Sequence, residues 1–422
     1  MPLVACGTLA GQTPPAASAA LRGKAIYLSH QTGGLQVNQY RELATRFGER
    51  HASAEIEVVP TPQGEGHQVK LQAMIAAGTP PETTFLADWD LIGFVERNLI
   101  DSLDDRAARD KFDLKAFFPA TLELCRWTLG GATKLWALPR HPSPLALFYS
   151  PERFAARGLK PPDATWTWDT LLETAKRLSG GGQWGTLSPY TIPHQAFPVV
   201  RSMGGDVLDK AASKFILHEP PAATTIQWIA DLSLRHQAAP PYAEVRGTAD
   251  GALFANGQAA MALGIYPFIG TVYSQGQGTV SFDVAPLPRG SRGRVNRNVA
   301  GTYPMIKGSA NPDVGWAWLK FLSTKEAQLF LAADGTVFPS LREAARSPEL
   351  LAPPPPAPRV SRKVFVDAVE SGIQIGEPCH RAYNDVTRLV SSTLVPVWEG
   401  QDTARAALQA IAGQVDALLA GR

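Results

Sequence analysis

The first part of the chain alternates between segments with the pattern of a strand and segments with the pattern of a helix. Short apolar runs at residues 24–30, 55–60 and 83–87 are typical of buried strands. Between them, apolar residues recur at helical spacing over residues 37–51 and 69–77. This order predicts parallel βαβ units, with helices on both faces of a sheet. The sequence therefore predicts an α/β fold.

Loops follow each of the three expected strands, at residues 30–34, 61–67 and 88–90. In a parallel sheet, ligands bind beyond the carboxyl ends of the strands. We therefore expect these loops to meet at one edge of the sheet, which becomes the first candidate for a binding site.

A second zone begins near residue 139, with an apolar strand-like run at 145–149 and helical segments at 151–158 and 167–178. Thr167 is well placed to cap the latter helix. A chain of 422 residues is long enough for two or three domains.

We predict two lobes, each a mostly parallel sheet flanked by helices and joined by a hinge. The expected ranges are a tether at 1–23, lobe 1 at 24–139 plus 290–345, and lobe 2 at 140–289 plus 346–422.

Composition excludes several functional classes. Hydrophobic residues make up 45% of the chain, yet no apolar stretch approaches the ~20 residues of a membrane span. The net charge is only +2, with both signs scattered along the chain, so we expect no nucleic-acid partner.

The N-terminus has the form of a bacterial lipobox, Leu-Val-Ala-Cys at residues 3–6, in which Cys6 would carry the lipid. Residues 7–23 are rich in Ala, Pro, Thr, Ser and Gln and predict a flexible tether. Only five residues precede Cys6 in this sequence, and they do not have the basic and apolar regions of a signal peptide. Two interpretations stay open: translation starts further upstream, or Cys6 is an ordinary cysteine. The other two cysteines, Cys125 and Cys379, are either free thiols or a disulfide.

The motifs of common enzymes are missing from the sequence. It contains no GxSxG, no HExxH, no Walker loop and no Cys/His metal cluster, so we expect no cofactor and no metal. Asp88 and Asp90 lie two residues apart after a strand and imitate a glycosidase pair. Side chains from one strand would hardly flank a scissile bond from opposite sides, so we expect no enzymatic activity.

Five segments together resemble the carbohydrate-type extracellular solute-binding proteins of ABC importers, the family that includes maltose-binding protein. The segment most similar to the family is Phe-Ala-Asn-Gly-Gln-Ala-Ala-Met at 254–261. The chain departs from the family pattern at Glu82 and Ser150, where the family usually has Asp and Asn. The segments are residues 70–82, 147–159, 167–172, 254–261 and 285–288. The resemblance spans nearly all of residues 24–422 and implies a two-lobed fold that closes over a solute at a hinge.

A sugar site needs polar groups for hydroxyls and flat rings for C–H faces. Asp88, Trp89 and Asp90 supply both within three residues, and by resemblance they fall near the sugar contacts of the family. The alternative is a surface loop in which Trp89 packs inward. The other candidate ligand contacts are His30, His141, Tyr266, Tyr303 and Tyr383, each with a structural role as its alternative.

The resemblance implies an extracytoplasmic, lipid-anchored monomer that captures a small solute, a carbohydrate in our interpretation, and delivers it to ABC permease subunits. Three alternatives stay open: a secreted polysaccharide hydrolase, a surface sensor without a transporter, and a receptor for an anionic or phosphorylated solute. The last would use a basic run that we otherwise interpret as a solvated hinge loop, Arg289, Arg292, Arg294 and Arg297.

Overall fold

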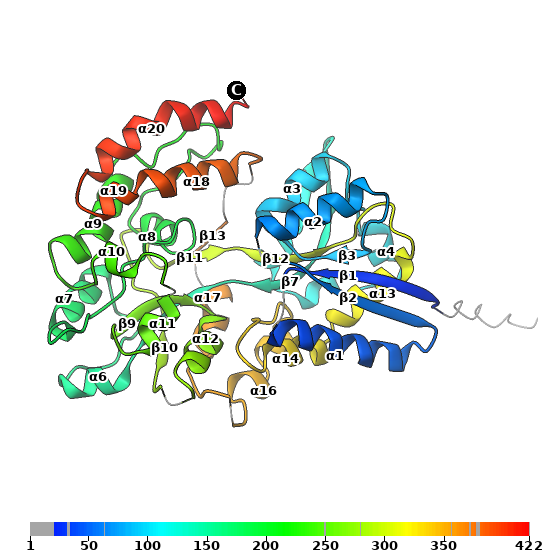
Figure 1. The fold of residues 1–422 in the computed structure, drawn as a ribbon, viewed down its shortest axis with the longest axis horizontal. Coiled ribbons are helices and arrows are strands. Elements are labelled where there is room, and N and C mark those ends of the chain that lie inside the picture. The colour runs from blue at the N-terminus through cyan, green and yellow to red at the C-terminus, as the bar shows by residue number, and fades with distance from the viewer. Residues whose placement is uncertain are drawn as a thin grey trace, which may run out of the picture.

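The computed structural model describes residues 21–31, 34–62, 64–248, 250–278, 280–355, 357–370, 373–376 and 380–421. The chain forms two lobes side by side, on the right and left of Figure 1, and strands near the centre run from one to the other. Cys6 and Cys379 lie outside the described residues, and Cys125 is a buried free thiol. Within the described ranges, no helix has the length and apolarity needed to cross a bilayer.

Lobe 1 is built mainly from the N-terminal part of the chain. Its strands are β1 (Gly23–Ser29), β2 (Ala54–Pro60), β3 (Thr83–Thr84), β4 (Leu86–Ala87), β5 (Arg126–Leu129), β6 (Ala132–Leu135), β7 (Ala137–Pro142) and β12 (Ala300–Pro304). Its helices are α1 (Leu35–Arg50), α2 (Glu65–Ala76), α3 (Asp88–Glu96), α4 (Asp104–Arg109), α5 (Pro119–Glu123), α13 (Pro312–Leu322) and α14 (Lys325–Ala332), with a 3-10 turn at Leu114–Ala116.

Lobe 2 contains the middle and the C-terminal parts. Its strands are β8 (Leu145–Tyr149), β9 (Met261–Ile265), β10 (Asp283–Ala285), β11 (Val295–Asn298) and β13 (Ile373–Gly376). Its helices are α6 (Pro151–Ala156), α7 (Trp168–Leu178), α8 (Ala196–Ser202), α9 (Ala222–Leu234), α10 (Tyr242–Val245), α11 (Asp250–Ala255), α12 (Phe268–Gln275), α17 (Lys363–Glu370), α18 (Tyr383–Thr393), α19 (Val395–Trp398) and α20 (Ala404–Leu419). The short helices α15 (Arg342–Ala345) and α16 (Pro348–Leu351) lie on the way from α14 to α17.

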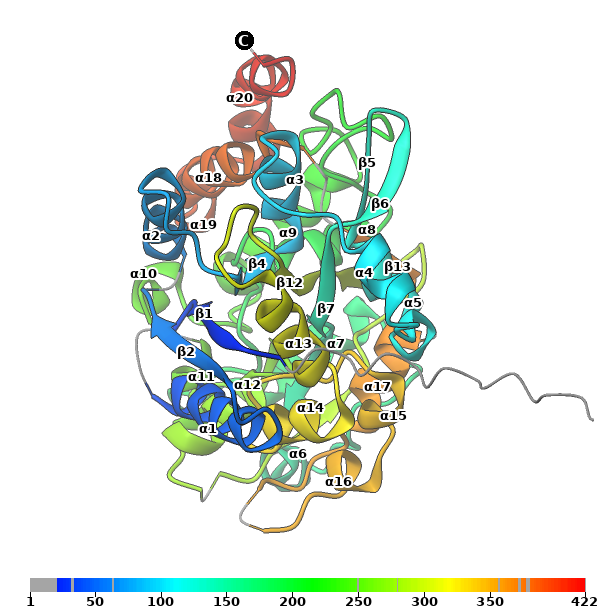
Figure 2. The ribbon, with the colours of Figure 1, turned by 90° about the vertical axis from the view of Figure 1, so that its right-hand side faces the viewer.

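The parallel βαβ pattern is confirmed in lobe 1. Strand β1 pairs in parallel with β2 and with β3, and α1 packs against β2 while α13 packs against β1 (Figure 2). The sheet of lobe 2 differs from the expectation, because β8 pairs antiparallel with both β9 and β10. Both partners follow β8 by more than a hundred residues, so no short local connection determines the direction in which they pair.

Near the centre of Figure 1, β7 leads into β8 and β11 leads into β12, and each step passes from one lobe to the other. The segment with α15 and α16 is a further connection, from α14 of lobe 1 to α17 of lobe 2. Strand β11 pairs with β13, whose residues we predicted in the other lobe. The predicted lobe ranges stay a proposal. We propose that the chain passes from lobe 2 to lobe 1 near Val299, between β11 and β12.

Each lobe has its own apolar core. That of lobe 1 includes Tyr27, Tyr40 and Trp318, and that of lobe 2 includes Trp168 and Trp398. A third cluster joins β8 and α12 to the segment around Phe338 and Phe365. The first two cores belong to one lobe each, whereas the third also includes Ala332 of α14 and so joins the lobes where the chain passes between them.

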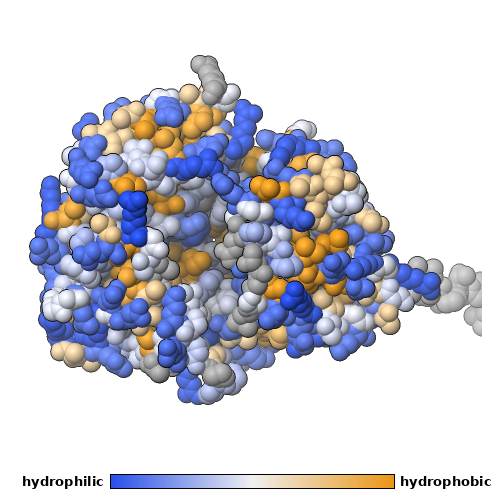
Figure 3. Space-filling model, viewed as in Figure 1, coloured by the Kyte–Doolittle hydropathy of each residue, from blue (hydrophilic) through white to orange (hydrophobic). Residues whose placement is uncertain are grey.

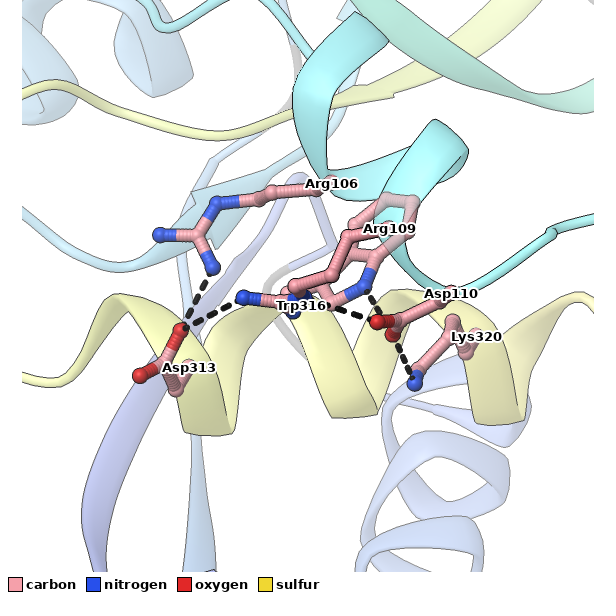
Figure 4. A network of polar contacts seen from close by, with 6 residues as sticks. All are labelled: Arg106, Arg109, Asp110, Asp313, Trp316 and Lys320. Carbon is pink, nitrogen blue, oxygen red and sulfur yellow. Dashed lines mark hydrogen bonds and ion pairs between the residues drawn. The ribbon is translucent and has the colours of Figure 1, made fainter. Parts of the chain in front are cut away.

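A polar cluster fastens α4 to α13 on the surface of lobe 1 (Figure 4). The Asp110 carboxylate accepts hydrogen bonds from Arg109 Nε and Trp316 Nε1, both at 2.8 Å, and pairs with Lys320. One turn away, Arg106 Nη1 donates to Asp313 at 2.6 Å. The bonds from Arg109, Lys320 and Trp316 hold the pKa of Asp110 well below its usual range.

Replacing Asp110 with Asn should lower the free energy of unfolding at pH 7 by about 1–2 kcal/mol, the usual contribution of hydrogen bonds to a charged group. Because the folded pKa is depressed, this contribution is present above the unfolded pKa of about 3.9 and is lost as the pH falls below it. Urea unfolding at pH 7 and pH 3 checks this. The exposed Asp105→Asn is the control and should change little; a D110N deficit that is the same at both pH values would contradict the prediction.

Candidate functional site

A cavity of about 420 Å³ lies between the two lobes. Figure 3 shows the molecular surface hollowed between the two halves of the molecule. The residues around the cavity come from both lobes and from the connections, and they include Phe85, Ala87, Trp89, His141, Ser143, Thr191, His194, Gln195, Asp250, Phe268, Thr271, Arg297 and Ala300. The cavity therefore meets the basic requirement of a site that closes around its ligand.

Trp89 is the main contribution of lobe 1. It lies in the first turn of α3 and reaches across to lobe 2, where its ring lies 6.0 Å from that of His194 and 6.3 Å from that of Tyr383, centroid to centroid. The expected loop at 88–90 is therefore wrong, because these three residues begin a helix.

The helical geometry separates the two carboxylates of the triplet. Asp88 is buried, and its Oδ1 accepts a hydrogen bond from the backbone N–H of Ala300 at 3.0 Å. Asp90 is half-buried and accepts from Asn384 Nδ2 at 3.0 Å, across the gap to lobe 2. Burial raises the pKa of Asp90. The two carboxylates thus serve different structural contacts and do not face one another over a shared substrate position.

The Phe85 ring forms a flat part of the cavity wall, and two histidines support Phe85. His30 stacks on it at 3.8 Å between ring centroids, and His67 Nε2 donates to the Phe85 carbonyl at 2.9 Å. Gly301 allows β12 to approach, because a Cβ there would lie 2.7 Å from the Phe85 ring and would also overlap His141. His30 thus supports the cavity wall and is not itself among the lining residues.

His141 lines the cavity and has a defined tautomer. Arg140 Nη1 lies 2.7 Å from His141 Nδ1, and an arginine can only donate, so Nδ1 accepts and Nε2 carries the proton. Burial and the charges of Arg140 and Arg297 hold the pKa of His141 well below its usual range. His141 is therefore a neutral hydrogen-bond donor through Nε2.

Lobe 2 contributes three polar residues that the sequence patterns did not single out. His194 and Gln195 precede α8, and Asp250 begins α11. Burial, assisted by Arg297, lowers the pKa of His194 to about 3. The sequence features that could have identified these three residues are weak. They are a polar pair after Pro193 and an Asp four residues before the Phe-Ala-Asn-Gly motif.

Arg297 departs from its expected place in a solvated loop. Arg289 and Arg292 are exposed, whereas Arg297 is 4% exposed and lines the cavity from β11. The basic run is therefore divided between the surface and the interior, because the strand beginning at Val295 draws only its last arginine inward.

The three tyrosine candidates are not among the residues that line the cavity. Tyr266 is in an apolar core, where its hydroxyl accepts from Arg362 at 2.8 Å. Tyr303 is buried in lobe 1 and forms a 2.7 Å hydrogen bond with Tyr40. Tyr383 is buried beside Trp89 at the start of α18. Of the predicted site residues, the structure brings Trp89 and His141 together around the cavity.

The lobes also touch at the edge of the cavity, where α18 faces α2 and α3. Besides the Asp90–Asn384 hydrogen bond, Arg388 lies 3.4 Å from Glu65. These contacts join side chains of opposite lobes, so they can form only when the lobes are close together.

The family model of the bacterial extracellular solute-binding proteins matches residues 33–329. One relative is an uncharacterized ABC transporter extracellular-binding protein of Pyrococcus horikoshii. It is 24% identical over 367 residues, which cover 82% of this chain and 79% of the relative.

Solved structures share the fold. An ABC substrate-binding protein of Listeria monocytogenes in complex with cycloalternan superposes with a TM-score of 0.80 at 19% identity, covering 94% of this chain and 98% of its own. The maltose-bound MalE3 protein of T. maritima gives a TM-score of 0.79 at 22% identity, covering 94% and 100%. The GacH receptor of Streptomyces glaucescens, solved unliganded and with acarbose, gives 0.79 at 20% identity, covering 95% and 99%.

Proposed function

The chain belongs to the bacterial extracellular solute-binding proteins, and on that premise we propose that its interlobe cavity binds a sugar or a short oligosaccharide for delivery to an ABC permease. The observation that carries this proposal is the composition of the cavity. Rings from both lobes, Phe85, Trp89 and Phe268, surround it together with polar side chains. Flat rings suit the C–H faces of a sugar, and amide, carboxylate and imidazole groups suit its hydroxyls.

The mechanism follows from a cavity shared by two rigid lobes. A solute that contacts Trp89 on one side and Gln195 on the other gains more interactions when the lobes are together than when they are apart. Such differential affinity shifts the equilibrium toward the closed form. A micromolar dissociation constant corresponds to roughly −8 kcal/mol.

The proposal includes no bond breaking in the solute. Asp88 is engaged with the backbone of Ala300 and Asp90 with Asn384, which speaks against the hydrolase alternative for this pair. The similar proteins solved with cycloalternan and with maltose support the carbohydrate class, each for its own protein. We further propose an extracytoplasmic monomer attached to the membrane by a lipid on Cys6.

Isothermal calorimetry against a panel of mono- and oligosaccharides tests the function, with small-angle scattering of the same samples. We expect one sugar class to bind and to lower the radius of gyration. A saturating sugar at 100 times its dissociation constant should also stabilise the protein by about 2.7 kcal/mol. Absence of binding across the panel, or turnover of a chromogenic glycoside that Asp90→Asn abolishes, would overturn the proposal.

A further inference from the structure

The orientation of the Gln195 amide is fixed by its neighbours. Its Nε2 donates to Asp250 Oδ2 at 2.8 Å and to the Leu263 carbonyl at 2.9 Å. A carbonyl accepts only, and so does an ionised carboxylate, so the NH₂ group must face them and the amide cannot be reversed. Its Oε1 is buried and has no hydrogen-bond partner among the described residues. Gln195 thus brings an unsatisfied acceptor to the cavity wall.

Asp250 brings a second acceptor, and it carries a charge. Burial raises its pKa, and the hydrogen bond from Gln195 only partly offsets that effect. Within the described ranges, no lysine or arginine forms an ion pair with it. The next residue, Gly251, lets α11 pack closely on α12, since a Cβ there would lie 2.6 Å from Thr271 Cγ2. Asp250 is half-buried. A partly desolvated carboxylate without a cation is costly, and a cation that reaches it recovers part of that cost.

Among the lining residues that the structure describes, Arg297 on β11 is the cationic side chain. The charge of Arg297 lowers the pKa of His141 and of His194. Arg297 is not among the causes of the Asp250 pKa shift, so Gln195 Oε1 and the Asp250 carboxylate line the cavity as two acceptors, the second of which is the anion. The solute group that faces lobe 2 must supply donors.

We propose that Asp250 and Gln195 form a subsite for a protonated amino group, so that the cavity prefers an amino sugar to the corresponding neutral sugar. The inference rests on the proposed function and deepens it. An ammonium group has three donors and a positive charge, so it can satisfy both Asp250 Oδ1 and Gln195 Oε1. A hydroxyl group has a single proton and no charge. A pair of neighbouring hydroxyls could supply two donors, but they would leave the carboxylate without a counter-charge.

Calorimetry at neutral pH with matched sugars tests the subsite. The pairs are glucose and glucosamine, galactose and galactosamine, and cellobiose and the dimer of glucosamine. N-acetylglucosamine is a further probe, because its acetylated amino group carries no charge. We expect at least one amino sugar to bind about tenfold or more tightly than its neutral partner, and N-acetylation to abolish that advantage.

Variants then assign the preference to the two residues. Asp250→Asn should weaken binding of the amino sugar most, and the amine-to-hydroxyl affinity ratio should fall to about one. The exposed Asp169→Asn on the same lobe should leave the ratio as in the wild type. Circular dichroism verifies that each variant is folded.

The outcomes separate the two proposals. Equal affinity for amino and neutral sugars, or a preference that survives in D250N, overturns the amino-group subsite and leaves the sugar receptor standing. If none of these sugars binds while another sugar of the wider panel does, the amino-group subsite falls and the sugar receptor stands. If no sugar of the wider panel binds, both proposals fall.

Discussion

Replacing Gly185 with alanine should lower the free energy of unfolding by about 3 kcal/mol or more. A Cβ at this position would overlap the carbonyl group of Ala175 in the last turns of α7. That carbonyl already accepts hydrogen bonds from the backbone N–H and the hydroxyl of Ser179, so it cannot turn aside without breaking the end of the helix. Both partners in the clash are backbone, and overpacking of this kind finds no flexible side chain to absorb it.

A second glycine substitution provides the matched control. Gly413 lies inside α20, where an added Cβ would meet no atom within 4 Å. Alanine is the better helix former by about 1 kcal/mol, so Gly413→Ala should stabilise the protein. Urea unfolding followed by circular dichroism measures both variants, and we expect shifts of opposite sign. A Gly185→Ala midpoint equal to the wild type would show that the two segments can separate at little cost.

Sequence patterns predicted the fold of lobe 1 well, because β1, α1 and β2 form from periodic apolar residues close together in the chain. The sheet of lobe 2 was predicted less well. Its strand β9 is more than a hundred residues away from β8, and no local pattern determines whether such a pair is parallel or antiparallel. The helical start at Asp88 was missed for a local reason, since an Asp-Trp-Asp triplet is equally compatible with a loop.

The site was predictable only where a residue follows an expected strand or lies on an expected crossover. Trp89 satisfies the first condition, whereas His141 was predicted because it lies on the expected first crossover between the lobes; both line the cavity. Gln195 and Asp250 satisfy neither condition, because they reach the cavity from helix starts that are adjacent only in the folded chain. Tyr266 is the opposite case, because it follows strand β9 and yet lies in an apolar core. An aromatic residue after a strand can point into the core as easily as into a cleft, and sequence does not distinguish the two.

Trp89→Ala should weaken solute binding by roughly 30- to 100-fold, or about 2–3 kcal/mol. Two losses combine in this estimate. The indole lines the cavity and would no longer pack on the solute, which removes the contact area and the ring interaction of a large aromatic group. The indole also contacts His194 and Tyr383 of lobe 2, so its removal takes away interlobe contacts that help hold the lobes together.

Companion variants separate the two contributions. Tyr383→Ala removes an interlobe contact and leaves the lining residues in place, so it should weaken binding several-fold through a smaller closed population. Trp89→Phe keeps a ring in the cavity and should fall between wild type and Trp89→Ala. Calorimetry gives the affinities, and scattering without solute gives the degree of closure. If Trp89→Ala binds as the wild type does while its scattering is unchanged, neither role holds, and the solute must make its contacts on another wall of the cavity.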